Sequence, residues 1–168
     1  MAPSGVDKGS VQAEELIVVD ANGAVTDGNG RASAETELHL CIMSSVGAGA
    51  VLHTHSVAAT VLSRVHGCDG FVQLEGWEML KGLNGIKSHE TTLAIPVVAN
   101  NQNMQQLSAS VKPHLHGPAW GILVAGHGLY AWGESLEQAR RHVEIIEFLL
   151  SAHLHYQQLR NTTHQIKL

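Results

Sequence analysis

Apolar and polar positions follow two different periods along this chain, and each change of period marks a strand or a helix. Short apolar runs bounded by turn-forming residues predict strands. Stretches in which apolar residues recur every three to four positions predict helices with one buried face. The predicted strands cover residues 15–20, 49–53, 70–74, 92–98, 120–125 and 129–132. The predicted helices cover residues 34–45, 56–65, 77–83, 104–111 and 135–159.

Local signals refine these elements. Ser33 is a candidate N-cap for the first helix, where the acidic side chains of Glu35 and Glu37 suit the helix dipole. Pro96 lies inside a predicted strand and favours a sheet edge or a bulge, because proline has no N–H to donate. In the last helix, Glu144 and Glu147 fall on the polar side and are expected to face solvent.

The remaining segments are predicted to be irregular. Residues 1–10 and 26–31 are rich in turn-forming residues and are expected to be loops. Residues 161–168 are expected to be a polar tail after a single domain at 1–160. Strands and helices are interleaved throughout, which favours an α/β domain built as a layered sandwich.

Composition narrows the function classes. The chain has 168 residues, enough for one domain with a substantial core. Charged residues make up 15% and the formal net charge is −5, which argues against a nucleic-acid surface. No apolar run approaches the roughly 18–20 residues that a membrane helix needs, so no membrane partner is expected. Cys41 and Cys68 form no disulfide framework, so we expect a cytoplasmic protein.

Three histidines carry the clearest chemical signal. His53 and His55 end an apolar run and lie two positions apart, so on an extended chain their side chains point to the same side. His127 stands between Gly126 and Gly128, where missing side chains let another group approach closely. A third imidazole beside the first two would give a three-nitrogen metal site with an open position, as catalytic zinc has. The alternative is that these histidines serve only in packing.

Other polar residues are weaker candidates. Glu78 lies in a predicted helix and can act as an acid or base, although Glu75 is equally eligible and an exposed helical glutamate is the plain alternative. Glu35 caps or precedes a helix and could also reach a metal ion as a fourth ligand. Ser4 and Gly5 offer a hydroxyl and an amide to an anion, unless the chain start is a free loop.

The chain resembles the class II aldolase/adducin family. Matching stretches occur in the family's order over nearly all of residues 2–150. They are Pro-Ser-Gly-Val-Asp-Lys-Gly, Leu-Ile-Val-Val-Asp, Ser-Ala-Glu-Thr, His-Thr-His-Ser, Glu-Met-Leu-Lys-Gly, Ile-Pro-Val-Val and Gly-His-Gly-Leu-Tyr-Ala-Trp-Gly. The His-x-His pair with the later Gly-His-Gly is fairly specific for the family. Glu-Met-Leu-Lys-Gly together with Tyr-Ala-Trp-Gly points to a branch of sugar-phosphate dehydratases.

The resemblance implies a fold and a reaction. The fold is a three-layer α/β/α sandwich around a mainly antiparallel sheet. The reaction is a metal-dependent lyase reaction, in which a ketose 1-phosphate loses water through an enediolate. The resemblance further implies one zinc ion per subunit and a ring-shaped homotetramer with sites between subunits.

The resemblance also assigns roles to individual residues. His53, His55 and His127 match zinc ligands, and Glu78 matches the catalytic acid/base. Glu35 matches the position that supplies a fourth, carboxylate ligand in the aldolases, and its ligation is open in the dehydratases. The residues that match the phosphate pocket are Ser4, Gly5 and Ser33.

One departure and two rival functions follow from the same comparison. Family members carry a further N-terminal segment that completes the phosphate site, and we expect this chain to lack it, which would weaken substrate binding. A retro-aldol enzyme that cleaves a sugar phosphate is the closest rival, and a firm fourth ligand at Glu35 would favour it. A non-catalytic interaction domain like that of adducin is the second rival, although it would have no need of three converging imidazoles.

Overall fold

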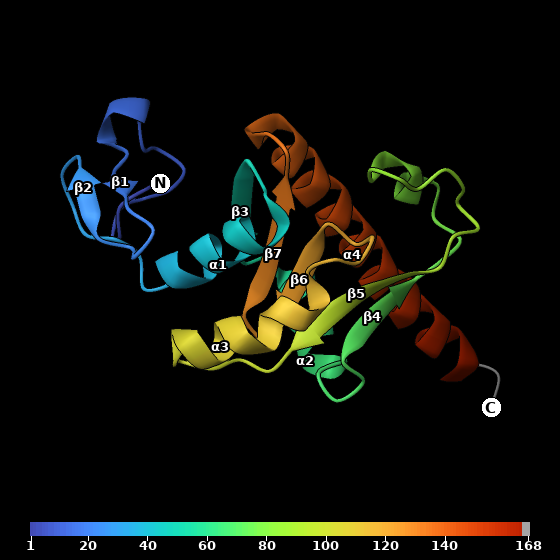
Figure 1. Cartoon of the computed structure of the whole chain (residues 1–168). Coiled ribbons are helices and arrows are strands. Elements are labelled where there is room, and N and C mark those ends of the chain that lie inside the picture. The colour runs from blue at the N-terminus through green and yellow to red at the C-terminus, as the bar shows by residue number, and fades with distance from the viewer. Residues whose placement is uncertain (166–168) are drawn as a thin grey trace.

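A five-stranded mixed sheet forms the centre of the computed structural model, which describes residues 1–165 (Figure 1). The strand order is β3-β7-β6-β5-β4. The strands are β3 (Ala50–Thr54), β4 (Phe71–Leu74), β5 (Leu93–Val98), β6 (Gly121–Val124) and β7 (Gly128–Gly133). The helices are α1 (Thr36–Val46), α2 (Val57–Val65), α3 (Met104–Val111) and α4 (Leu136–Gln165). Three short 3-10 turns are η1 (Ala13–Glu15), η2 (Glu78–Gly82) and η3 (Lys112–His114).

The helices cover both faces of the sheet. On one face, α1 and α3 enclose a core that includes Ile122, Tyr130 and Trp132. On the other face, α2 and α4 enclose a larger core that includes Leu123 and Leu129. Successive residues of β6 and β7 thus serve opposite cores, as the two-residue period of a strand requires. The expected three-layer sandwich is confirmed.

The expected mainly antiparallel sheet is confirmed as well. Only β5 and β6 pair in parallel, while the other three strand pairs of this sheet are antiparallel. Pro96 is not at a sheet edge, because β5 lies between β6 and β4. The ladder with β6 begins at Val97, so on that side Pro96 has no partner that would need an N–H.

The topology gives the sheet two distinct ends. Thr54, the last residue of β3, pairs with Leu129 near the start of β7, and Val98 ends β5 beside Val124, the end of β6. These termini and the turn between β6 and β7 therefore share one end of the sheet. Leu74, where β4 ends, pairs with Leu93 at the opposite end, and η2 follows β4 there.

The first 31 residues differ from expectation. Instead of a strand over 15–20, they contain η1 and a two-stranded ribbon of β1 (Val18–Val19) and β2 (Val25–Asp27), which lies beyond α1 at the left of Figure 1. Within the predicted run only Ile17 is buried, while Leu16 and Val18 are exposed. The side chain of Asp20 accepts hydrogen bonds from the N–H groups of Asn22 and Ala24, which closes a hairpin and ends the run.

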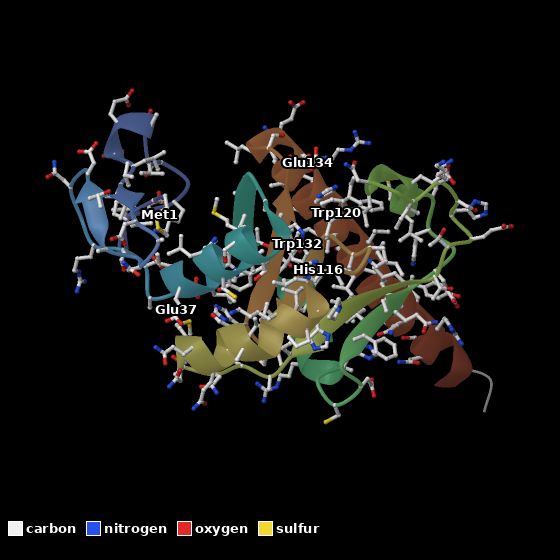
Figure 2. The ribbon with its side chains drawn as sticks, viewed as in Figure 1. Met1, Glu37, His116, Trp120, Trp132 and Glu134 are labelled. Atoms are coloured by element: carbon white, nitrogen blue, oxygen red, sulfur yellow. The ribbon has the colours of Figure 1, made fainter. Side chains whose placement is uncertain are left out.

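Two helix boundaries also differ from those predicted from the sequence. Helix α1 begins at Thr36 with Glu35 as its N-cap residue, two positions later than the proposed Ser33 cap. Helix α4 continues to Gln165, through the first part of the expected tail, and residues 166–168 lie outside the described residues. Exposed side chains such as Glu37 and Glu134 point outward, whereas Trp132 lies within the body (Figure 2).

The described part of the chain has two further features. No helix there has the length and the apolar content needed to cross a membrane. Cys41 is buried and Cys68 is exposed, and both are free thiols.

Candidate metal centre

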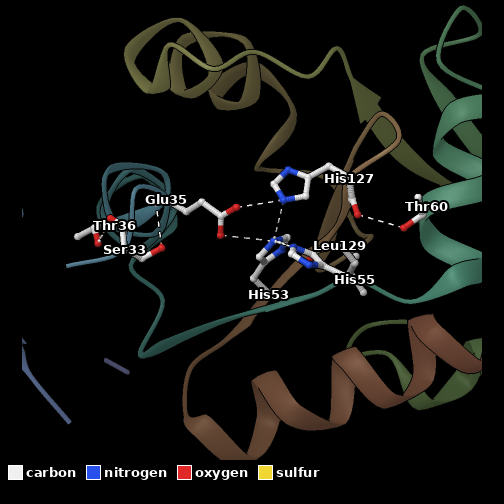
Figure 3. Close-up of polar contacts among 8 residues, drawn as sticks. All are labelled: Ser33, Glu35, Thr36, His53, His55, Thr60, His127 and Leu129. Carbon is white, nitrogen blue, oxygen red and sulfur yellow. Dashed lines mark hydrogen bonds and ion pairs between the residues drawn. The ribbon is translucent and has the colours of Figure 1, made fainter. Parts of the chain in front are cut away.

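Three imidazoles meet at the end of β3 and the turn after β6 (Figure 3). The Nε2 atom of His53 lies 2.6 Å from Nε2 of His55 and 3.4 Å from Nε2 of His127. His53 is the fourth residue of β3, while His55 follows the strand, so the extended backbone brings both rings to one side. The predicted convergence of these three histidines is therefore present in the structure.

Helix α2 anchors the turn that carries His127. The Thr60 hydroxyl donates to the carbonyl of His127 at 3.1 Å, and the N–H of Gly126 donates to the Ser63 hydroxyl at 3.0 Å. Gly126 has φ of 65°, a left-handed conformation that few other residues adopt readily. A Cβ atom on Gly128 would lie 2.1 Å from the carbonyl oxygen of Thr54, so only glycine allows β7 to approach β3 here. Both glycines that flank His127 thus shape the site.

Glu35 brings a carboxylate to the same point. Its Oε1 lies 3.0 Å from Nε2 of His127, and its Oε2 lies 3.5 Å from Nε2 of His53. The N–H of Glu35 donates to the Ser33 hydroxyl, so Ser33 fixes the backbone just before α1. The side chain of Glu35 makes no capping hydrogen bond, which leaves its oxygens directed at the histidines.

The four donor groups fit a divalent metal ion. Their ligand atoms all lie within 4.8 Å of one another, and this is the one such group found among the described residues. Zinc–nitrogen bonds of about 2.0–2.1 Å in a tetrahedron place two ligand nitrogens roughly 3.4 Å apart. His53 and His127 have this spacing, whereas His53 and His55 lie closer, at 2.6 Å. Three nitrogens and a carboxylate that approach one point suit Zn²⁺ and related ions.

The surroundings of His53 keep it ready to bind metal. Its Nδ1 lies 2.8 Å from the carbonyl oxygen of Leu129, which fixes the tautomer with the proton on Nδ1 and the lone pair on Nε2. The pKa of His53 is lowered to about 4, mainly by burial and to a lesser extent by His55 and His127, while the Leu129 carbonyl and Glu35 act in the opposite direction. The imidazole is therefore neutral at pH 7, the form that coordinates a metal ion.

Acid should destabilise the metal-free protein. Burial lowers the pKa of His53, and also that of His142, whose Nδ1 bonds the carbonyl of Trp132. Above the unfolded pKa of 6.5 this stabilisation is complete, and it is lost as the pH falls from 6.5 toward the folded pKa, because the unfolded chain then binds more protons. His53 alone should lower the free energy of unfolding by about 2 kcal/mol at pH 5.

Urea unfolding at pH 7.5 and 5.0, with chelator present, measures this difference. A variant of the exposed His116, His116→Gln, serves as control and should show the same difference as the unmodified chain. Equal stability at both pH values would contradict the assignment of neutral, buried histidines.

The proposed phosphate-binding residues lie along the segment that leads to the metal centre. The N–H of Ser4 donates to the carbonyl of Arg31, two residues before Ser33. Gly5 has φ of 81° and is exposed next to Ser4. Ser33 in turn accepts from the N–H of Glu35, so Ser4 and the metal centre are linked through a short stretch of backbone. Phosphate binding at this loop stays a prediction.

Glu78 is not part of this cluster. It lies in η2, at the other end of the sheet, where the Arg141 side chain donates to the carbonyl of Gly82. The five steps of β5 alone separate the two ends by roughly 16 Å, and η2 is the green turn at the upper right of Figure 1. Glu78 is exposed, and hydrogen bonding and ion pairing with Lys81 lower the pKa of its carboxyl. The apolar setting expected for a protonated acid is absent around Glu78 within one chain.

Sequence reasoning missed several residues that support the centre. Tyr130 is fully buried and stacks on the His53 ring, with centroids 3.9 Å apart. Glu147 was expected to face solvent, but it is partly buried and accepts a hydrogen bond from Thr54. Thr60 and Ser63 were part of a predicted helix without a separate role. The alternation of residues in strand 129–132 could have placed Tyr130 opposite His53, whereas no local pattern marks the other three.

Comparison with known proteins shows the family of this chain. Residues 1–154 match the model of the class II aldolase and adducin N-terminal domain. The chain is 45% identical over 161 residues to methylthioribulose-1-phosphate dehydratase of Xanthomonas euvesicatoria, covering 95% of this chain and 74% of that protein. It is 43% identical over 158 residues to the enzyme of the same name in Acidiphilium cryptum, covering 94% of this chain and 74% of that protein.

Solved structures show the same fold. An L-fuculose 1-phosphate aldolase superposes with a TM-score of 0.75 at 22% identity, covering 94% of this chain and 69% of that one. The L-fuculose-1-phosphate aldolase from Thermus thermophilus superposes with a TM-score of 0.72 at 24% identity, covering 95% and 78%. The match over residues 1–154, the layered fold and the converging histidines lead to one assignment: this chain belongs to the class II aldolase and adducin family.

Proposed function

We propose that the chain is a zinc-dependent hydro-lyase that converts 5-methylthioribulose 1-phosphate into 2,3-diketo-5-methylthiopentyl 1-phosphate. The observation that carries this proposal is the convergence of His53, His55 and His127 in a chain 45% identical to proteins named methylthioribulose-1-phosphate dehydratase. On this proposal the protein acts in the cytoplasm, in methionine salvage.

Each group of residues has a part in the reaction. The three histidines hold the ion as neutral ligands, and Ser4, Gly5 and Ser33 bind the substrate phosphate. When bound, the ion supplies Lewis acidity that polarises the substrate carbonyl and makes the neighbouring C3 proton more acidic. A base takes up that proton, and the substrate becomes an enediolate. Glu78 donates a proton to the C4 hydroxyl, which leaves as water, and the resulting enol rearranges to the diketone.

The position of Glu78 requires a second copy of the chain. An exposed carboxylate at the opposite end of the sheet cannot reach an ion held by its own His53, yet it is free to enter the site of a neighbour. We therefore propose a homo-oligomer, a tetramer in line with the family resemblance, in which Glu78 of one subunit acts at the metal centre of the next. Buried between two subunits, the carboxyl would lose solvent, which raises the pKa of a glutamate toward that of a working acid.

One observation favours a second candidate function. The carboxylate of Glu35 lies close enough to the histidines to serve as a fourth ligand, the arrangement expected of an aldolase that cleaves a sugar phosphate. A carboxylate ligand also reduces the positive charge of the ion and weakens it as a Lewis acid. Relatives at 45% identity outweigh aldolase structures below 25%, so dehydration remains the first proposal.

Offering both substrates tests the choice. With zinc present, the protein should turn 5-methylthioribulose 1-phosphate into a product lighter by one water, detected by mass spectrometry. It should release no dihydroxyacetone phosphate from L-fuculose 1-phosphate. Release of that triose without dehydration would establish the aldolase instead, and activity toward neither substrate in a zinc-loaded protein would contradict both functions.

A further inference from the structure

The end of β3 has backbone pairing on one side only. Within the described residues, β3 pairs only with β7, and the pair of Thr54 with Leu129 is the last of that ladder. His55 follows beyond the ladder. Two of the three imidazoles therefore lie at the end of an edge strand. The Leu129 carbonyl and the Tyr130 ring orient His53, but the position of the strand end that carries His55 depends on a further contact.

Thr54 supplies that contact from the reverse side of the strand. Because side chains alternate, Thr54 points away from the face that His53 and His55 share, toward α4. Its hydroxyl donates a hydrogen bond to Oε1 of Glu147. A charged acceptor makes this bond stronger than one between neutral groups.

Glu147 is an unusual choice for a purely structural partner. It lies on α4 next to the buried Ile146 and one turn before Leu150. Its second oxygen, Oε2, is buried and has no hydrogen-bond partner among the described residues. Leaving a carboxylate oxygen unpaired in such a place costs stability, so a stability role alone does not account for this residue.

We infer that Glu147 is a positioning residue for the metal centre: through Thr54 it fixes the end of β3 so that His53 and His55 face one ion. This inference rests on the proposed metal site. Loss of Glu147 should therefore weaken metal binding more than it lowers the stability of the metal-free fold. No contact between Glu147 and the ion or the substrate is involved.

The experiment compares Thr54→Val, which removes the hydroxyl and keeps the shape, with Thr54→Ser, which keeps the hydroxyl. The zinc dissociation constant is measured by competition with a chromophoric chelator, and thermal unfolding is followed with and without zinc. Thr54→Val and Glu147→Ala should each raise the dissociation constant tenfold or more, in the range found for residues that orient metal ligands. Thr54→Ser should restore it, and the double variant should be no worse than the single ones.

Glu144→Ala is the matched control. Glu144 lies on the same helix one turn earlier, pairs with Arg140 in solvent, and should leave zinc binding unchanged. If Thr54→Val and Glu147→Ala lower the melting temperature of the metal-free protein but leave the dissociation constant unchanged, Glu147 is merely structural and the inference is wrong. An unmodified chain that binds no zinc would overturn the metal centre itself, and with it this role of Glu147. Where Glu147→Ala does not fold, the pair of Thr54 variants decides.

Discussion

Replacing His127 by alanine should remove the metal ion and the activity together. In the proposed metal site His127 supplies one of three nitrogens, and its Nε2 lies 3.0 Å from the carboxylate of Glu35, nearer than Nε2 of His53. With one nitrogen gone, His53 and His55, even with the carboxylate of Glu35, should bind a divalent ion far more weakly, since the site then lacks the set of ligands that zinc prefers. Metal analysis after dialysis should find less than a tenth of the zinc held by the unmodified protein, and turnover should fall by the same proportion or more.

The control for this variant is His116→Ala. His116 is exposed and lies outside the cluster, so its loss should change neither zinc content nor turnover. Circular dichroism of His127→Ala should match the unmodified chain, because the turn is held by backbone contacts with Thr60 and Ser63. Full zinc occupancy in His127→Ala would show that His127 is not a ligand.

Glu78→Gln should lose turnover while keeping both zinc and fold. The side chain is exposed and makes contacts only with Lys81 and His89 among the described residues, so neutralising it disturbs no core. A general acid contributes about a hundredfold to ten-thousandfold to a rate, so kcat should fall by at least two orders of magnitude. Zinc content and melting temperature should stay close to those of the unmodified protein.

Mixing subunits tests where Glu78 acts. If the proposed oligomer forms, coexpressed Glu78→Gln and His127→Ala chains should give mixed oligomers in which an intact metal centre can meet an intact Glu78 from a neighbour. Activity should then reappear, although each variant alone is inactive. Recovery would be impossible if Glu78 served the ion of its own chain, and retained turnover in Glu78→Gln would remove this residue from the mechanism.

The parts of the fold set by local pattern could be predicted from the sequence. The runs at 49–53 and 129–132 have the two-residue period of strands, and that period alone places His53 and His55 on one side. A layered α/β architecture follows from alternating strands and helices, whereas the three-layer form was implied by the family resemblance. The hairpin near Asp20 was missed because its apolar run looks like a core strand until the turn hydrogen bonds are known.

Contacts between distant segments could not be predicted in this way. Glu35 has the sequence context of a helix-capping acid, and only the packing of α1 against β3 turns its carboxylate toward the imidazoles. Glu147 sits among alternating charged and apolar positions of a long helix, where a solvent-facing side chain is the ordinary expectation. Its bond to Thr54 spans 93 residues of sequence, a separation over which no local pattern carries information.

The place of β3 at the rim of the sheet has a consequence for the protein in cells. An open rim exposes unpaired backbone groups that can recruit strands from other molecules. An ion bound by His53, His55 and His127 would fix the end of this edge strand to the turn between β6 and β7. Loss of zinc would then affect more than catalysis. The metal-free protein would expose a less firmly held edge strand to other molecules and become prone to aggregation.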